Sequence, residues 1–161
     1  MKLNEHFLNK ILIIDDEEKL RQLLKRIISL EGFDVSESGS LKEAVKLLYK
    51  ESSDVVLCDV KLPDGNGVDF VKELKIRYPA TEFILLTAYG NIADGVQAMR
   101  NGAFDYMTKG DDNDKIIPLL HRALEKVHLA RKLEQLQKQV GQKYSFESIL
   151  GDSVEINEAI T

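Results

Sequence analysis

The stretch VVLCDVKLPDGNG (Val55–Gly67) places one aspartate, Asp59, directly behind a run of four apolar residues. The run is continuously apolar rather than alternating, which is typical of a parallel strand that is covered on both faces. A proline and two glycines then indicate a turn-rich loop. We therefore predict a buried strand that ends on a bare carboxylate, at the edge where the chain leaves the sheet.

Strand-like runs of this kind alternate with helix-periodic segments along the chain. The predicted strands are Lys10–Asp15, Gly32–Ser38, Asp54–Asp59, Glu82–Thr87 and Ala103–Thr108. The predicted helices between them are Glu17–Leu30, Leu41–Lys50 with Ser40 as its N-cap, Val68–Arg77 and Ile92–Asn101. This alternation indicates an α/β protein with a parallel sheet and helices on both faces.

The composition of the strand-like runs also predicts their order in the sheet. The first, third and fourth runs are continuously apolar, whereas the second alternates and the fifth contains Asp105. Continuous strands belong in the centre and mixed ones at the edges, so we predict the five-stranded order 2-1-3-4-5 of a doubly wound, flavodoxin-like sheet. Such sheets bind ligands at the carboxyl ends of the strands, where the winding direction switches, here between strands one and three.

The residues at these strand ends favour phosphoryl transfer. Asp15 and Asp16 lie at the end of the first strand, Asp59 ends the third, Thr87 ends the fourth and Lys109 follows the fifth. Carboxylates that share a crevice repel one another unless a proton or a cation neutralises them, and oxygen-only ligands suit Mg2+. With a metal and an ammonium group alongside, an aspartate attacks phosphorus and forms an acyl phosphate. We interpret Asp59 as a phosphoryl acceptor.

Each of these elements also has a simpler interpretation. The acidic run from Asp15 to Glu18 is typical of a capped helix start, and an aspartate before a Pro/Gly loop is commonly a turn residue. Thr87 and Lys109 carry almost no information when each is taken alone. Only the convergence of four elements on four neighbouring strand ends favours the functional interpretation.

Four motifs resemble, in order and spacing, those of the receiver domain of bacterial two-component response regulators. They are IIDDEE, LCDVKLPDGNG, LLTAYG and GAFDYMTKG. The resemblance covers about residues 9–125 and implies that Asp59 accepts phosphate from a sensor histidine kinase. It implies that Asp16 and Asp59 bind Mg2+ directly, that Asp15 acts mainly through water, and that the main-chain carbonyl of Lys61 is a further metal ligand.

The resemblance further implies a switch. Thr87 would move to the phosphoryl group, Lys109 would pair with it, and Tyr106 would be the aromatic residue that turns inward on activation. In one departure from the family pattern, Gly110 stands where a proline, often after a cis peptide bond, usually follows this lysine. A trans bond with a shifted loop and a strained cis bond both remain open.

Helical periodicity continues beyond the predicted receiver. A helix that starts near Asp111–Asp114 would pack on the sheet, and apolar three–four spacing then continues out to Gly141. The residues expected on this dimer linker are Val127, Leu129, Leu133, Leu136 and Val140. Leucines at that spacing beyond a sheet favour a coiled coil, so we predict a homodimer through residues 126–143 and the fourth and fifth elements of the receiver.

The final segment, SFESILGDSVEINEAIT, resembles the entry to the central AAA+ ATPase domain of the NtrC-like enhancer-binding activators, which act on the sigma-N polymerase. We expect residues 144–161 to be the start of a truncated ATPase domain, with ATPase and DNA-binding domains downstream in a full-length protein. No GxxxxGK[ST] loop and no helix-turn-helix is reached, so we expect neither ATP hydrolysis by that route nor direct DNA binding. A tail without functional meaning is the alternative.

Composition and site chemistry weigh against other functions. The net charge is −5 with mixed signs and no basic block, and neither a signal peptide nor a membrane-length apolar run is present, so we expect a cytoplasmic protein that binds neither nucleic acid nor membrane. A haloacid-dehalogenase-type phosphatase needs an aspartate where Lys61 stands, and a flavin binder needs a phosphate loop where DDEEKL stands. A contact-only receiver is a third alternative. We expect no enzyme beyond self-catalysed phosphotransfer and dephosphorylation.

Overall fold

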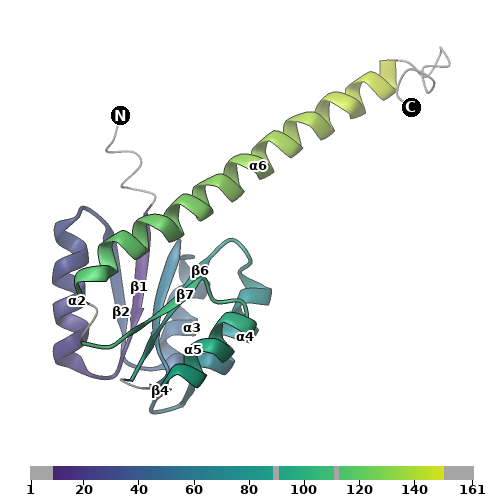
Figure 1. The fold of residues 1–161 in the computed structure, drawn as a ribbon. Helices are drawn as coiled ribbons and strands as arrows, with labels where there is room; N and C mark the ends of the chain where they lie inside the picture. Colours follow the sequence, from purple (N-terminus) through teal and green to yellow (C-terminus); the bar gives the residue numbers. More distant parts are fainter. Residues whose placement is uncertain (1–8, 89–90, 111–112, 151–161) are drawn as a thin grey trace. The chain divides into compact units, whose positions relative to one another are not determined.

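Five parallel strands form the main sheet (Figure 1). The computed structural model describes residues 9–88, 91–110 and 113–150, with side chains as far as residue 141. The sheet strands are β1 (Lys10–Ile14), β2 (Asp34–Ser38), β3 (Val55–Asp59), β6 (Glu82–Thr87) and β7 (Asp105–Thr108). Their order is β2-β1-β3-β6-β7 and every neighbouring pair is parallel. Counted along the chain, this is the predicted order 2-1-3-4-5, so the predicted flavodoxin-like α/β fold is confirmed.

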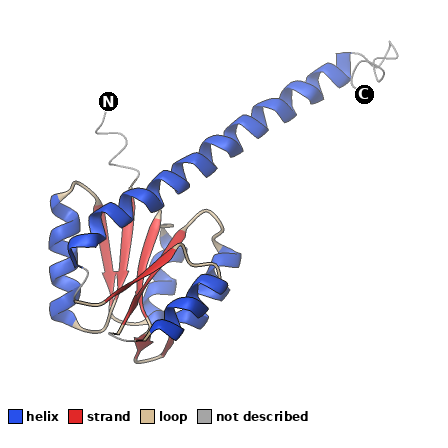
Figure 2. Cartoon of the chain, viewed as in Figure 1, coloured by secondary structure: helices blue, strands red, loops and turns tan. Residues whose placement is uncertain are grey.

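Helices connect the strands and cover both faces of the sheet (Figure 2). They are α2 (Glu18–Leu30), α3 (Leu41–Lys50), α4 (Gly67–Arg77), α5 (Ile92–Arg100) and α6 (Ile116–Leu150). Apart from α6, the observed boundaries lie within two residues of the predicted ones. Ser40 caps α3 as predicted, because its Oγ accepts a hydrogen bond from the Glu43 amide at 3.2 Å.

Alternating side chains of the central strands supply two apolar layers. Ile11 and Ile13 of β1 pack in a core with α2 and the first turns of α6. Leu12 and Ile14 of the same strand pack in a second core with α3, α4 and α5. All four side chains are buried, which explains why this strand is apolar throughout rather than at every second position.

Helix α6 differs from the prediction at both ends. It begins at Ile116, after a 3-10 turn at Asn113–Lys115, and residues 111–112 of the predicted start lie outside the described residues. Pro118 lies in its first turn, where a missing amide hydrogen removes no intrahelical bond. At the other end α6 continues through Gly141, since one glycine in a helix interior costs only about 1 kcal/mol.

The chain divides into two units, Met1–Val127 and His128–Thr161. Val127 is only 1% exposed, because it lies three and four residues after Leu124 and Ala123 on the buried face of α6. The prediction that Val127 belongs to an exposed dimer face is therefore wrong. In the described ranges, no helix combines the length and the apolar character that crossing a membrane requires.

The loop after Asp59 is held at two places. It contains an antiparallel pair, β4 (Lys61–Leu62) and β5 (Gly65–Asn66). Between these strands, the Asp64 carboxylate accepts hydrogen bonds at 2.9 Å from the first two amides of α3. Asn66 Oδ1 accepts a hydrogen bond from the Val68 amide at 2.7 Å and so caps α4. The turn-rich sequence therefore ties the end of β3 to two helix N-termini.

Gly67→Ala is expected to destabilise the fold, because α4 begins in direct contact with the backbone of Asp59. A Cβ at position 67 would lie 2.1 Å from the Asp59 carbonyl oxygen. The backbone has to shift, and we expect urea unfolding to show a loss of about 1–3 kcal/mol. Gly141→Ala is the control, since a Cβ there meets nothing within 4 Å, and it should cause no loss. Wild-type stability of Gly67→Ala would contradict this packing.

Candidate functional site

Main-chain hydrogen bonds bring three strand ends to one edge of the sheet. The Asp15 amide donates to the Ser38 carbonyl at 3.0 Å, which extends the pairing of β1 with β2. The Lys109 amide donates to the Thr87 carbonyl at 2.8 Å and extends the pairing of β7 with β6 in the same way. Asp59 is the last residue of β3, which lies between β1 and β6. The side chains of all three strand ends therefore start from fixed backbone positions.

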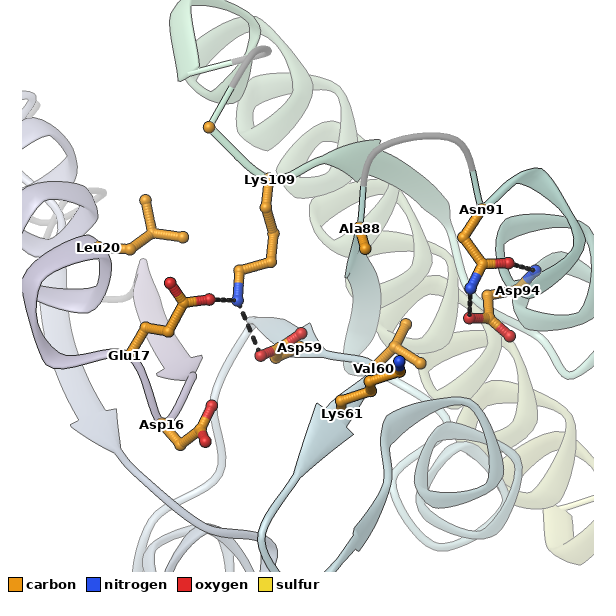
Figure 3. A pocket seen from close by; sticks show the side chains of 11 residues that line it. Asp16, Glu17, Leu20, Asp59, Val60, Lys61, Ala88, Asn91, Asp94 and Lys109 are labelled. Atoms are coloured by element: carbon orange, nitrogen blue, oxygen red, sulfur yellow. Dashed lines mark hydrogen bonds and ion pairs between the residues drawn. The ribbon is translucent and has the colours of Figure 1, made fainter.

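The ammonium group of Lys109 lies among three carboxylates, two of which, Glu17 and Asp59, are seen in Figure 3. Its Nζ donates to Asp59 Oδ2 at 3.0 Å and to Asp15 Oδ1 at 3.4 Å, and it also donates to Glu17 Oε1. The side chains of Asp15 and Asp59 are 0% and 7% exposed, so solvent and salt screen these ion pairs weakly. One ammonium group therefore offsets part of the negative charge that the strand ends bring together.

The Asp15 carboxylate is fully buried, and one of its two oxygens lacks a hydrogen-bond partner among the described residues. Its Oδ1 accepts hydrogen bonds from the Glu17 amide and Lys109, whereas its buried Oδ2 has no hydrogen-bond partner among the residues that the structure describes. Burial raises the pKa of Asp15 to about 6, and the charge of Asp59 acts in the same direction. Burial would lower the pKa of Lys109, but its contacts with Glu17, Asp59 and Asp15 hold that pKa well above its ordinary value.

The carboxylates of the site fit a hard divalent cation. Oxygen atoms of Asp15, Glu17 and Asp59 all lie within 4.8 Å of one another. Oxygen-only donors suit Mg2+, and a buried oxygen without a partner, such as Asp15 Oδ2, is the kind of atom that a bound ion satisfies. The residues present therefore form a cluster that could hold a metal ion.

A cavity of about 540 Å3 opens beside these carboxylates. Its lining residues are Asp16, Glu17, Leu20, Asp59, Val60, Lys61, Ala88, Asn91, Asp94, Lys109 and Gly110. Four predicted site residues thus line one cavity: Asp16, Asp59, Lys61 and Lys109. The buried Asp15 does not line it, but its carboxylate contacts the ammonium group of Lys109. The cavity has the size of a small-molecule site.

Thr87 and Tyr106, the other two predicted site residues, do not line the cavity. Thr87 is buried, and its Oγ1 donates to the Met107 carbonyl at 3.3 Å. Tyr106 is half-buried on β7, and its ring lies against Gly95 of α5, where a Cβ would come within 2.4 Å of ring carbon Cε2. The Thr87 hydroxyl therefore reaches the cavity only if it leaves the Met107 carbonyl.

The turn at Lys109 departs from the family pattern as the sequence indicated. The Lys109–Gly110 peptide bond is trans, which resolves the alternative that the sequence left open. Gly110 has a φ of +84°, a backbone conformation that glycine adopts at little cost. Lys109 nevertheless reaches Asp59, so the substitution of the family's proline leaves the lysine in the site.

Sequence reasoning missed three residues of this region. Glu17 was assigned only to a helix start; it is the N-cap of α2, but its side chain makes no capping bond and reaches Lys109 instead. Asn91 and Asp94 line the cavity, and Asn91 Oδ1 accepts a hydrogen bond from the Asp94 amide at 3.3 Å. The spacing of Asn91 and Asp94 is a recognisable capping signal, whereas nothing in the sequence indicates the direction of the Glu17 side chain.

Asp15→Asn is expected to stabilise the metal-free protein, because it removes a buried charge and keeps an Oδ1 acceptor for the Glu17 amide. An acid whose pKa is raised in the folded state destabilises the fold as pH rises from the unfolded to the folded pKa. The gain should therefore be absent below about pH 4 and complete above about pH 6, where it should reach about 2–3 kcal/mol.

Urea unfolding with a chelator, at about pH 4 and about pH 7.5, measures this difference. Asp69→Asn is the matched control, since Asp69 is exposed on α4 and its replacement should be neutral at both pH values. A lower stability of Asp15→Asn than of the wild type near neutral pH would contradict the burial argument.

Comparison with known proteins gives the family. Residues 11–121 match the family model of the response regulator receiver domain. Regulatory protein AtoC of Escherichia coli is 32% identical over 146 residues, which are 91% of this chain and 32% of AtoC. Response regulator protein PilR of Pseudomonas aeruginosa is 39% identical over 115 residues, which are 71% of this chain and 26% of PilR. The chain thus spans about a third or less of these curated relatives.

The solved structures agree with these relatives. The beryllofluoride-activated NtrC4 receiver domain dimer matches with a TM-score of 0.69 at 29% identity, covering 73% of this chain and 98% of that chain. The match extends over nearly the whole NtrC4 receiver, so the likeness concerns the complete domain and not a shared motif. The chain belongs to the response regulator receiver family, and its receiver domain is related to those of NtrC-type activators.

Proposed function

We propose that Asp59 accepts a phosphoryl group from a sensor histidine kinase and that this modification controls a transcription regulator. The observation that supports this most directly is the position of the Asp59 carboxylate. It ends a buried strand, lies 3.0 Å from the Lys109 ammonium and faces a cavity of about 540 Å3. A carboxylate so placed is a nucleophile with charge compensation already beside it.

In the proposed transfer, a carboxylate oxygen of Asp59 attacks phosphorus and the bond between phosphorus and the kinase imidazole nitrogen breaks. The electron pair of the broken bond stays on the imidazole, and Asp59 becomes an acyl phosphate. Asp16, Asp59 and the main-chain carbonyl of Lys61 would hold Mg2+, with Asp15 acting mainly through water, and the ion would supply positive charge to the phosphoryl oxygens. Lys109 supplies a second positive charge from the end of β7.

A phosphoacceptor fits this site better than an enzyme that turns over a separate substrate. In a haloacid-dehalogenase-type phosphatase, the residue two positions after the nucleophile is an acid that protonates the leaving group. That position is Lys61, which lines the cavity and cannot act as a carboxylic acid. A contact-only receiver is the remaining alternative, and the assembled carboxylate–lysine cluster favours the phosphoacceptor over it.

We propose that the phosphoryl group acts on the face formed by α5, β7 and α6. It adds a charge of about −1.5 to −2, which Lys109 and the Thr87 hydroxyl would bind. Thr87 would then leave the Met107 carbonyl on β7. Tyr106, the residue before Met107, lies against Gly95 of α5, so movement of β7 would change this contact. Turning of the Tyr106 ring would then change the surface of this face in the activated state.

Intact-mass spectrometry after incubation with acetyl phosphate tests the phosphoacceptor proposal. With Mg2+ we expect addition of one phosphoryl group, and with a chelator none. Asp59→Asn should abolish the addition, whereas the matched control Asp69→Asn, an exposed aspartate of α4, should retain it. Undiminished addition to Asp59→Asn would move the acceptor elsewhere, and no addition to the wild type would favour the contact-only receiver.

We also propose that the chain forms a homodimer through α6 and α5. Four apolar residues of α6 at three–four spacing, Leu129, Leu133, Leu136 and Val140, are 49–62% exposed. On α5, Ile92, Val96 and Met99 form a second exposed apolar row. Exposed apolar rows at helical spacing indicate partner helices. The related NtrC4 receiver was solved as a dimer, which is consistent with this proposal.

For the output, we propose an NtrC-like activator that acts on the sigma-N polymerase through an AAA+ ATPase. In this proposal, residues 9–125 are the receiver, 126–143 the coiled-coil linker and 144–161 the start of the ATPase domain. The AtoC alignment supports it, since it spans 146 residues and so extends beyond the receiver match. Residues 151–161 lie outside the described residues, and α6 remains helical to Leu150.

The double substitution Leu133→Glu, Leu136→Glu is expected to weaken the homodimer at least about tenfold, because it places charges on the apolar row of α6. Size-exclusion light scattering over a concentration series measures the effect. Lys138→Glu is the control: it changes the net charge by the same amount on the opposite side of the helix and should leave the dimer intact. A monomeric wild type at high concentration, or an unchanged double variant, would contradict the proposed interface.

A further inference from the structure

Glu17 belongs to the carboxylate cluster more closely than its place in the sequence indicates. It precedes α2 as the N-cap residue, yet its side chain makes no capping hydrogen bond. The carboxylate instead accepts a hydrogen bond from Lys109 Nζ, as Figure 3 shows. One of its oxygens lies within 4.8 Å of oxygens of both Asp15 and Asp59. Glu17 is therefore the third carboxylate of the cluster.

Asp16 has a different position. It lines the same cavity, but the trio of mutually close oxygens comprises Asp15, Glu17 and Asp59. Figure 3 shows the Glu17 side chain directed toward Lys109 and Asp59, whereas Asp16 lies below them. Two acidic side chains after β1 thus line the cavity, and Glu17 is the one that forms a group of mutually close oxygens with Asp15 and Asp59.

A cation already occupies this trio. The ammonium of Lys109 contacts an oxygen of each of the three residues. A divalent ion that enters the trio competes with that ammonium for the same oxygens. A divalent ion could also bind the buried Oδ2 of Asp15, which Lys109 does not contact and which has no hydrogen-bond partner among the described residues. The cluster thus contains both a resident cation and an unfilled acceptor.

We propose that Glu17 is a further acidic residue of the cation site, which supplies an oxygen to the divalent ion that displaces Lys109. The proposal rests on the proposed function in one respect, since the ion it names is the Mg2+ of phosphoryl transfer. Glu17 is mostly exposed, with a side chain at 61%, so its carboxylate reaches a bound ion without breaking any packing. Hard divalent ions favour such anionic oxygen ligands.

The competing explanation is that Glu17 forms only a surface ion pair with Lys109. Exposed ion pairs contribute little, and such a pair would influence the metal only through the lysine. The two explanations differ when Lys109 is removed. A ligand of the ion acts whether or not the lysine is present, whereas an ion-pair partner has no effect without it. A double-mutant cycle therefore separates them.

The test is the Mg2+ dissociation constant of the unphosphorylated chain, measured by calorimetry or by NMR titration with MgCl2. Glu17→Gln should weaken Mg2+ binding about tenfold, in the range seen for residues that orient or supply metal ligands. Glu18→Gln is the control, because it removes the same charge from the next residue, which is exposed and accepts a hydrogen bond from Gln22. It should change the constant less than about twofold, since solvent screens that charge.

The same substitution is then made in a Lys109→Met background, where the weakening by Glu17→Gln should persist. Equal effects of Glu17→Gln and Glu18→Gln, or a loss of the Glu17→Gln effect without Lys109, would overturn the proposal. Wild-type protein that binds no Mg2+ would contradict the metal-dependent proposed function itself, which is a different result. Circular dichroism of each variant checks the fold, and Glu17→Asp should recover part of the lost affinity if an anionic oxygen is what the ion requires.

Discussion

The ammonium of Lys109 balances the charge that parallel strand pairing concentrates at one edge of the sheet. Asp15 and Asp59 are brought together because β1 and β3 are parallel neighbours that end side by side. Both carboxylates are shielded from water, so their repulsion is large unless a cation lies between them. Lys109 reaches them from the end of β7, two strands away from β3 in the sheet. The site therefore depends on the order of the strands as much as on its residues.

The same arrangement supports the proposal that the site responds to a new charge. Lys109 divides its hydrogen bonds among three carboxylates, and Thr87 uses its hydroxyl on the neighbouring strand. Both groups could exchange their present hydrogen-bond partners for phosphoryl oxygens. Through β7, Thr87 and Lys109 are connected to Tyr106 and so to the exposed apolar row of α5. In the proposed switch, a change at Asp59 would be transmitted along this path to α5.

The sequence was sufficient for those features that follow from burial and from strand ends. Continuously apolar runs identified the central strands, and the position of Asp59 after such a run pointed to the candidate site. Side-chain direction is what the sequence could not supply. The contact of Glu17 with Lys109 and the hydrogen bond of Thr87 to Met107 depend on rotamers that packing selects. Val127 shows a related limit, because the apolar residues of α6 form two offset series: one ends in the core at Val127, and the other starts at the exposed Leu129.

The central claim is that Lys109 and a divalent cation compete for the same carboxylate oxygens. The most direct test follows the side-chain methylene resonances of Lys109, assigned with a Lys109→Arg variant, while Mg2+ is added to the unphosphorylated protein. The account predicts that these resonances shift together with those of Asp59 and saturate at the same Mg2+ concentration. Binding of Mg2+ that shifts the Asp59 resonances and leaves Lys109 unchanged would contradict it.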